Sequence, residues 1–278
     1  MWLRVLWYSI GITAVFAVAM PGSADQLWRA SFLPVTHGMF WYFSSYVLMM
    51  LFLPLVNSEL SRMSSKRHGL LLAMMFVLIF ISSMGTVGTD KDPFGLFKGF
   101  SAMWLLMLGM LGGWLKRIRA ERLHPALALC GYFFCTLISW GEKLLRTGRL
   151  GALPWDFDGL FIQYTSLMTT GAAVFLLLFF ARLRISGRAA RLVSRLSALS
   201  FSVYIIHTHP LMSEHLLTGL FAGWSSLPPL RLTVYVCAAA VGIYLLFSLV
   251  DLPRDLLFRK LKIPQRLRSM EQRLRLLE

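Results

Sequence analysis

The residues best suited to chemistry lie in the stretch LSFSVYIIHTHPLM, residues 199–212, inside an otherwise apolar region. Tyr204 and His207 are three residues apart, so a helix would place them on one face. His209 points elsewhere, and Pro210 removes a backbone hydrogen bond and bends or breaks a helix. Polar side chains in apolar surroundings usually face a cavity or one another, and imidazole exchanges protons near neutral pH. We interpret the stretch as a site; the alternative is that His207 only hydrogen-bonds a neighbouring helix.

A second cluster of aromatic and hydroxyl side chains occurs in HGMFWYFSSYVLMMLFLPLVN, residues 37–57. Trp41, Tyr42 and Tyr46 gather near the beginning of this apolar segment. Aromatic side chains at such a place can bind a ligand, and they are equally typical of the belt that anchors a helix at a membrane interface. Both interpretations stay open at this point.

Membrane-crossing helices must position these two clusters. The chain has 278 residues, of which 57% are hydrophobic, and its mean hydropathy is +0.64; soluble domains contain about 45–50% apolar residues. The apolar residues form runs of roughly 15–22 residues, close to the length that crosses a bilayer core, whereas a β-barrel would show shorter alternating segments. We predict an all-α, polytopic membrane protein. Its eight expected transmembrane helices cover residues 2–20, 40–55, 70–84, 96–115, 125–140, 160–181, 200–221 and 232–250.

The formal net charge of +15 suggests a nucleic-acid-binding protein, but the distribution of the charges argues against one. The basic residues concentrate between alternate apolar runs, where Lys and Arg set the topology of a membrane protein. We therefore predict that the Arg-rich loops and both termini lie in the cytoplasm. The loops contain Arg62, Lys66 and Arg67; Lys116, Arg117, Arg119 and Arg122; and Arg182, Arg184, Arg188, Arg191 and Arg195.

We divide the chain into a membrane-embedded domain, residues 1–252, and a basic amphipathic tail, residues 253–278. The tail alternates Leu or Phe with Arg and Lys, a pattern that suits short helices on the anionic inner leaflet. The first apolar run resembles a secretory signal, but its length favours a retained helix. Cys130, Cys135 and Cys237 lie inside apolar runs and form no metal-ligand cluster and no disulfide framework. We expect no metal.

Two of these segments resemble the acyltransferase-3 family of integral-membrane enzymes. FWYFSSYVLMMLFLPLVN, residues 40–57, is similar to the family segment with an aromatic pair, a tyrosine and a Leu–Pro helix end. LSALSFSVYIIHTHPLM, residues 196–212, is similar to the late Ser-x-x-x-Tyr-x-Ile-His helix of the family. Weaker similarity extends in the right order over nearly the whole chain.

The resemblance implies an O-acyltransferase of a bacterial inner membrane. Such an enzyme takes an acyl group, often acetyl from acetyl-CoA, and places it on a hydroxyl of a cell-surface glycan or lipid-linked saccharide. The implied partners are therefore the lipid bilayer, acyl-CoA and the saccharide, with no nucleic acid. The implied catalytic residues are His207, as general base, and Tyr204, as hydrogen-bond donor; the implied substrate-binding residues are Trp41, Tyr42, Tyr46 and His209.

One part of the family pattern is not found in this sequence. Family members begin with a helix that bears a functional histidine, followed by an Arg-containing stretch, and the first apolar run here resembles their third helix. Two explanations stay open: Met1 is an internal start of a longer protein, or the chain is a remnant without activity.

Two other classes of function fit the same sequence. A transporter or flippase also builds its site from proline-broken helices with polar residues at mid-depth, but it predicts internal repeats, and none is evident. A non-catalytic membrane subunit would use the helices only to pack against a partner. The Arg-rich loops could attract the phosphates of CoA, although a role in fixing topology is sufficient to explain them.

Overall fold

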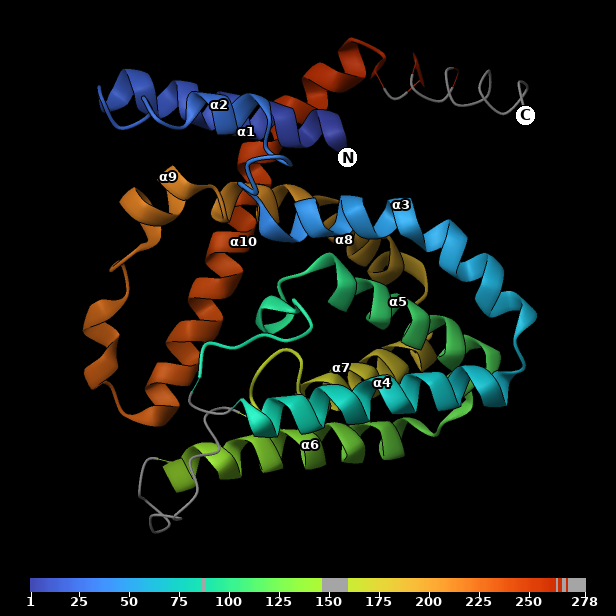
Figure 1. Cartoon of the computed structure of the whole chain (residues 1–278). Helices are drawn as coiled ribbons and strands as arrows, with labels where there is room; N and C mark the ends of the chain where they lie inside the picture. Colours follow the sequence, from blue (N-terminus) through green and yellow to red (C-terminus); the bar gives the residue numbers. More distant parts are fainter. Residues whose placement is uncertain (87–88, 147–159, 264, 267–268, 270–278) are drawn as a thin grey trace. The chain divides into compact units, whose positions relative to one another are not determined.

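The computed structural model describes residues 1–86, 89–146, 160–263, 265–266 and 269 (Figure 1). The described residues form helices joined by turns and contain no strand, which confirms the predicted all-α class. The chain divides into two compact units, each with its own helix packing.

Unit 1, Met1–Phe40 with Ile185–Glu278, combines the first and last helices of the chain. Helix α1 contacts α2, α8 and α9, and α10 lies against α8. The helices are α1 Trp2–Ala19, α2 Trp28–Phe32, α8 Gly187–His207, α9 Pro210–Met212 and α10 Pro229–Lys260. Phe16, Ala24 and Leu211 form a buried apolar cluster, so the residues just after α8 are packed against α1.

Unit 2, Trp41–Arg184, is a bundle of five longer helices. They are α3 Trp41–Arg62, α4 Ser65–Gly85, α5 Ala102–Arg117, α6 Pro125–Arg146 and α7 Leu167–Arg182. Helix α5 packs against α3 and α4, and α6 packs against α7. Ser64, Ser101 and Ser166 cap α4, α5 and α7, because each hydroxyl accepts a hydrogen bond from a backbone N–H of the first turn.

Helices α6 and α7 approach closely at two glycines. A Cβ atom at Gly131 would lie 2.7 Å from a ring carbon of Phe175, and one at Gly171 would lie 3.0 Å from Sγ of Cys135. Gly131 of α6 meets Phe175 of α7, whereas the later α6 residue Cys135 meets the earlier α7 residue Gly171, so the helices are antiparallel. Small residues at a helix interface permit this close packing.

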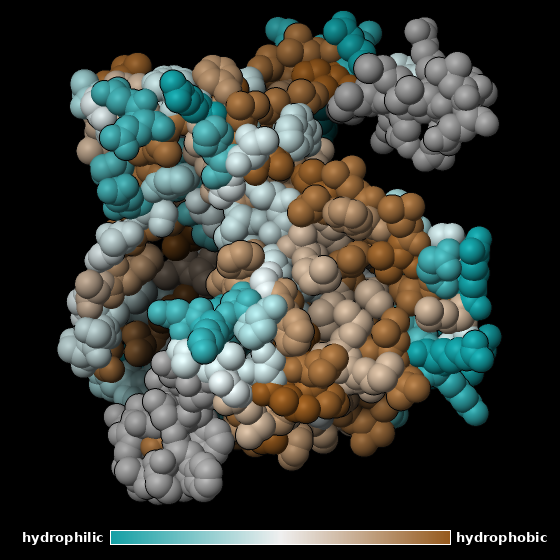
Figure 2. Space-filling view, in the orientation of Figure 1, coloured by the Kyte–Doolittle hydropathy of each residue, from teal (hydrophilic) through white to brown (hydrophobic). Residues whose placement is uncertain are grey.

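The surface of the molecule carries many large apolar side chains, as the brown areas of Figure 2 show. Val18 is 84% exposed, Leu230 is 79% exposed and Leu55 is 68% exposed. Five described helices, α1, α3, α4, α8 and α10, are long and apolar enough to cross a bilayer, and α7 is a shorter apolar helix. Exposed apolar surface of this extent needs a lipid environment. The chain is therefore a multi-pass membrane protein, and the count of eight crossings stays a prediction.

The predicted helix over residues 200–221 is wrong at both ends. Helix α8 begins at Gly187, so the basic side chains of Arg188, Arg191 and Arg195 belong to a helix and not to a loop. It ends at His207, because the residue before a proline is disfavoured in the helical conformation. His209 is accordingly extended, with φ −61° and ψ 129°.

The boundary proposed between a membrane domain and a tail at residues 252 and 253 lies inside a helix. Helix α10 continues through Pro253 and ends at Lys260. Within the proposed tail, positions 264, 267–268 and 270–278 lie outside the described residues.

Candidate active site

Tyr204 and His207 lie together on the last turn of α8. Their ring centroids are 6.0 Å apart with an interplanar angle of 75°, an edge-to-face arrangement that follows from their spacing of three residues. The His207 side chain is exposed, and Tyr204 is half-buried. The structure therefore brings the two predicted catalytic residues together and leaves the imidazole accessible.

The backbone of α8 fixes the proton arrangement of His207. Its Nδ1 atom lies 2.9 Å from the carbonyl oxygen of Val203. A carbonyl oxygen only accepts hydrogen bonds, so Nδ1 carries the hydrogen in the neutral ring. Nε2 is then the atom with the free electron pair, and it is the atom that can take up a proton.

The hydroxyl group of Thr208 stabilises the turn that follows His207. Thr208 Oγ1 donates a hydrogen bond to the carbonyl oxygen of Tyr204 at 2.6 Å, and the Thr208 backbone N–H donates to the same oxygen at 3.1 Å. This closes the helix one residue before His209, which the following proline keeps extended.

His209 lies in the interior of unit 1, with no exposed surface. Its Nε2 is 3.3 Å from the carbonyl oxygen of Ser9 and 3.3 Å from Thr13 Oγ1, so Nε2 is the donor to Ser9. Its ring packs 6.2 Å from that of Phe40, and Nδ1 has no hydrogen-bond partner among the described residues. The structure thus places this predicted substrate-binding residue in a buried network.

That network contains three hydroxyl groups that were not among the predicted site residues. Thr13 Oγ1 donates to the carbonyl oxygen of Ser9 at 2.7 Å and lies 2.6 Å from Ser31 Oγ. Ser9 Oγ donates to the carbonyl oxygen of Ser31 at 2.7 Å. Together with His209 these groups join α1, α2 and the turn after α8. The spacing of four between Ser9 and Thr13 on an apolar helix is the signal that would have revealed them.

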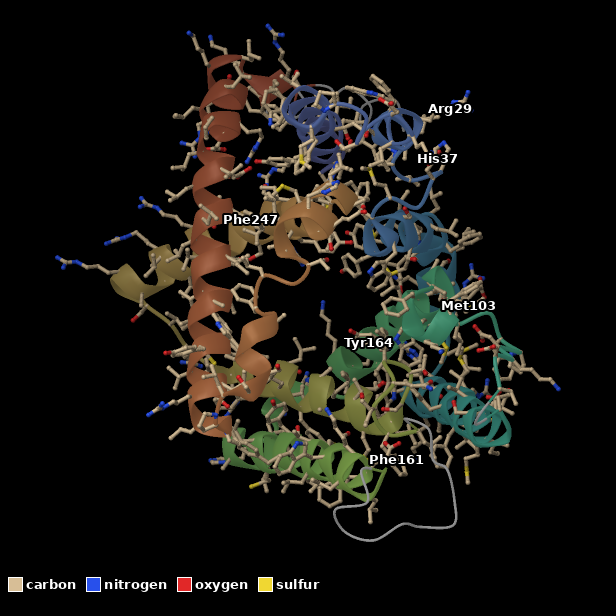
Figure 3. The ribbon with its side chains drawn as sticks, turned by 90° about the vertical axis from the view of Figure 1, so that its left-hand side faces the viewer. Arg29, His37, Met103, Phe161, Tyr164 and Phe247 are labelled. Atoms are coloured by element: carbon tan, nitrogen blue, oxygen red, sulfur yellow. The ribbon has the colours of Figure 1, made fainter. Side chains whose placement is uncertain are left out.

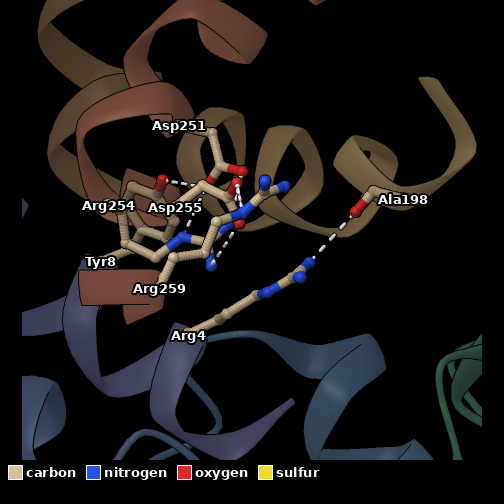
Figure 4. A network of polar contacts seen from close by, with 7 residues as sticks. All are labelled: Arg4, Tyr8, Ala198, Asp251, Arg254, Asp255 and Arg259. Atoms are coloured by element: carbon tan, nitrogen blue, oxygen red, sulfur yellow. Dashed lines mark hydrogen bonds and ion pairs between the residues drawn. The ribbon is translucent and has the colours of Figure 1, made fainter. Parts of the chain in front are cut away.

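A second buried polar network joins α1 to α10 (Figure 4). Arg254 donates from Nε to Asp251 Oδ1 at 2.9 Å and from Nη2 to Asp251 Oδ2 at 2.6 Å. The Tyr8 hydroxyl donates to the same carboxylate. Asp251 is fully buried, and Arg254 is 3% exposed. Arg254 was expected in the basic tail, and the structure shows it as half of a buried ion pair.

The predicted aromatic residues gather in unit 2, on the first turns of α3. The ring centroids of Trp41 and Tyr42 are 5.7 Å apart, and those of Tyr42 and Tyr46 are 6.2 Å apart and stacked. Trp41 also contacts Phe100 edge-to-face at 4.5 Å, and Phe100 contacts Tyr164 at 5.2 Å. Trp41 and Tyr42 are about two-fifths exposed, so this cluster presents aromatic surface. The described residues contain no group of His, Cys, Asp and Glu that could hold a metal ion.

Helix length, apolar surface and a polar turn at the end of α8 define a class of protein, a multi-pass membrane protein with an accessible histidine. A family model described as an acyltransferase domain matches residues 1–248. The chain therefore belongs to the acyltransferase-3 family, as the two sequence segments indicated. No curated protein matches the chain, and no solved structure matches it.

Proposed function

We propose that this protein is a membrane O-acyltransferase that moves an acetyl group from acetyl-CoA to a hydroxyl of a cell-surface glycan, in a bacterial inner membrane. Family membership supports acyl transfer, and the long apolar helices support the membrane environment. The donor, the acceptor and the membrane concerned are parts of the proposal.

The observation that carries the proposal is the state of His207. Its ring is exposed, and its Nδ1 hydrogen is directed to the carbonyl oxygen of Val203. This contact holds the ring in one tautomer, with Nε2 as the proton acceptor, which is the arrangement that a general base requires.

The chemical step follows from that arrangement. His207 Nε2 removes the proton from an acceptor hydroxyl while the hydroxyl oxygen attacks the thioester carbon. The carbon–sulfur bond then breaks, and the thiolate of CoA receives the proton that the imidazolium carries. Tyr204, beside His207, donates a hydrogen bond to the oxyanion that forms between the two events.

Helix α8 also carries groups suited to the donor. Three exposed arginines lie in the N-terminal half of α8, whereas His207 is the last residue of this helix. They are Arg188, Arg191 and Arg195. Twelve residues separate Arg195 from His207, a distance of about 18 Å along the helix axis at about 1.5 Å per residue. A CoA molecule held by its phosphates at the basic residues would extend its thioester arm along α8 toward the imidazole.

Basic side chains at one end of unit 2 bear on how this unit is oriented in the membrane. Arg117 donates to the carbonyl oxygens of Leu60, Ser61 and Met63 at 2.8–3.1 Å, so the ends of α3 and α5 meet at one end of the unit. Hydrophilic side chains gather where α3 turns into α4 (Figure 2). By the positive-inside rule this basic end of unit 2 faces the cytoplasm in our proposal.

The test is acetyl transfer in membrane vesicles that contain the full chain. We would add radiolabelled acetyl-CoA, isolate the envelope glycan of the producing cells and count the label. His207→Ala should lower the initial rate at least about 100-fold, because a positioned general base contributes about 10²–10⁴-fold. His37→Ala is the matched control, since His37 is also an exposed histidine of unit 1 (Figure 3).

Each outcome bears on the proposal. Transfer by the wild type and by His37→Ala, with loss in His207→Ala, supports it. Equal transfer by wild type and His207→Ala removes His207 from the mechanism. If the glycan from vesicles with the protein carries no more label than the glycan from vesicles without it, acyl transfer to glycan is overturned.

A further inference from the structure

Unit 2 contains a buried carboxylate that the proposed chemistry does not use, Glu142 of α6. Its side chain is 5% exposed. Oε2 accepts a hydrogen bond from the backbone N–H of Phe161 at 2.8 Å, whereas Oε1 is buried and has no hydrogen-bond partner among the described residues. None of the ion pairs in the described part of the chain includes Glu142. Because burial removes the water that stabilises a charge, a carboxylate in such a place needs a cationic partner.

Hydroxyl groups gather at the turn that contacts Glu142. Ser139 lies one turn earlier on α6, and its Oγ donates to the carbonyl oxygen of Phe161 at 2.8 Å. Ser166 Oγ donates to the same oxygen at 3.0 Å, and Thr169 Oγ1 donates to the next carbonyl oxygen along the chain at 3.2 Å. A hydroxyl group has one hydrogen and two lone pairs. Since backbone carbonyls take the hydrogens, these oxygens have only lone pairs left to offer.

A second buried oxygen of this region also lacks a partner. Thr170 is 8% exposed and lies one helical turn after Ser166 on α7. Its Oγ1 atom, like Oε1 of Glu142, has no hydrogen-bond partner among the described residues. Buried polar atoms are nearly always paired, so two unpaired oxygens in one region indicate that a further group binds there.

The chemistry of the cluster selects a cation. Carboxylate and hydroxyl oxygens are the ligands that hard metal ions prefer. Glu142 also lies four residues before α6 ends at Arg146, and the partial negative charge at the end of a helix favours cations. The cluster is therefore negative both through its carboxylate and through the helix that carries it.

The size of the charge selects a monovalent ion. Calcium sites usually combine several carboxylates, whereas Glu142 is the one ionisable side chain of this cluster among the described residues. One positive charge neutralises it. We infer that the cluster binds a monovalent metal cation, Na⁺, which ties the end of α6 to the turn before α7. The oxygen ligands come from the side chains of Glu142, Ser139, Ser166 and Thr169.

A cavity of about 400 Å³ in unit 2 gives an ion access to this turn. Its walls come from the segment between α4 and α5 and from the segment before α7. Leu160, Gln163 and Thr165 line it, and they lie in the same turn as Phe161 and Tyr164 (Figure 3). The cavity is large enough for water molecules, so a hydrated ion reaches the segment that holds Glu142.

The inference goes beyond acyl transfer and does not depend on it. Sodium binding is measured on the purified full chain in lipid nanodiscs, without an acyl donor or an acceptor. Two measurements are combined: the radioactive sodium that the protein retains, and its melting temperature in sodium chloride and in choline chloride at equal ionic strength. When the sodium concentration exceeds the dissociation constant about fivefold, the melting temperature should rise by about 2–4 °C.

The variants separate this site from general salt effects. Glu142→Gln keeps an oxygen that accepts from the Phe161 N–H and removes the charge, so it should retain no sodium and show no sodium-dependent rise. Ser139→Ala removes one hydroxyl ligand and should weaken sodium binding about fivefold or more. Glu121→Gln is the matched control, because Glu121 is an exposed carboxylate between α5 and α6 of the same unit.

Each outcome decides for or against the site. Sodium retention by the wild type and by Glu121→Gln, lost in Glu142→Gln and weakened in Ser139→Ala, supports the inference even if no acetyl transfer is detected. The inference is overturned if the wild type retains no sodium, or if both cluster variants bind as the wild type does. It is also overturned if acidification in choline chloride stabilises the wild type and sodium adds nothing, because a proton then neutralises Glu142. If Glu142→Gln does not fold, unchanged binding in Ser139→Ala alone overturns it.

Discussion

Replacing Arg254 with methionine should destabilise the protein strongly. The guanidinium of Arg254 and the carboxylate of Asp251 are 3% and 0% exposed and form two hydrogen bonds of 2.6 and 2.9 Å. Arg254→Met leaves the carboxylate buried without its cationic partner, although the Tyr8 hydroxyl still donates to it. Removing one partner of a buried ion pair costs about 3–5 kcal/mol.

The double replacement gives the sharper result. Asp251→Leu alone should also cost about 3–5 kcal/mol, so two independent effects would sum to about 6–10 kcal/mol. Replacing both charges with apolar groups of similar size removes the unpaired charge, and the Tyr8 hydroxyl is then left without its partner. We expect the double variant to lose only about 1–3 kcal/mol, the cost of an unsatisfied buried polar group.

The measurement is thermal unfolding of the variants in nanodiscs. After heating, the fraction of protein that remains monodisperse is determined by size-exclusion chromatography. Arg259→Met is the matched control, because Arg259 pairs with Asp255 at 2.7 Å but its side chain is 75% exposed. An exposed pair contributes about 0–1 kcal/mol. If Arg254→Met behaves as Arg259→Met does, or if the double variant loses the sum of the single effects, the account of this network is refuted.

Two further predictions concern packing and the buried hydroxyl network. Gly131→Ala should destabilise by about 1–3 kcal/mol, since its Cβ would lie 2.7 Å from the Phe175 ring; Gly141→Ala, on the same helix with nothing within 4 Å, should be neutral or stabilising, and equal melting temperatures for the two variants would contradict this. Thr13→Val should cost about 1–3 kcal/mol, because the methyl group cannot bond to His209 Nε2 or donate to the carbonyl oxygen of Ser9. Unchanged thermal unfolding of Thr13→Val would show that this network adds nothing to stability.

The helical class was predictable because a helix that crosses the bilayer needs a long run of apolar residues, which is visible in the sequence. Apolar runs identified the positions of most helices, and α1 at Trp2–Ala19 agrees with the expected residues 2–20 to within one residue. The ends were harder to predict where polar residues continue a helix. Arg188 and Arg191 looked like loop residues, yet α8 begins at Gly187.

The break after His207 was predictable only in part. Pro210 signals an interruption, but periodicity alone does not say whether the chain bends or stops. The structure shows a stop, closed by Thr208 and followed by an extended His209. That local detail separates the two histidines, with His207 exposed and His209 buried.

Long-range pairing was the part that the sequence could not show. Tyr8 and Asp251 are 243 residues apart, and Thr13 and His209 are 196 residues apart. Nothing in the local pattern around Arg254 distinguishes it from the exposed basic residues nearby. The cavity of unit 2 likewise depends on two segments that meet only in the folded chain.

The most direct test of the central claim is the initial rate of acetyl transfer by His207→Ala with and without added imidazole. If His207 Nε2 is the proton acceptor, the variant should be inactive alone and should recover part of the wild-type rate as imidazole is added. A variant that transfers acetyl at the wild-type rate without imidazole would contradict the claim.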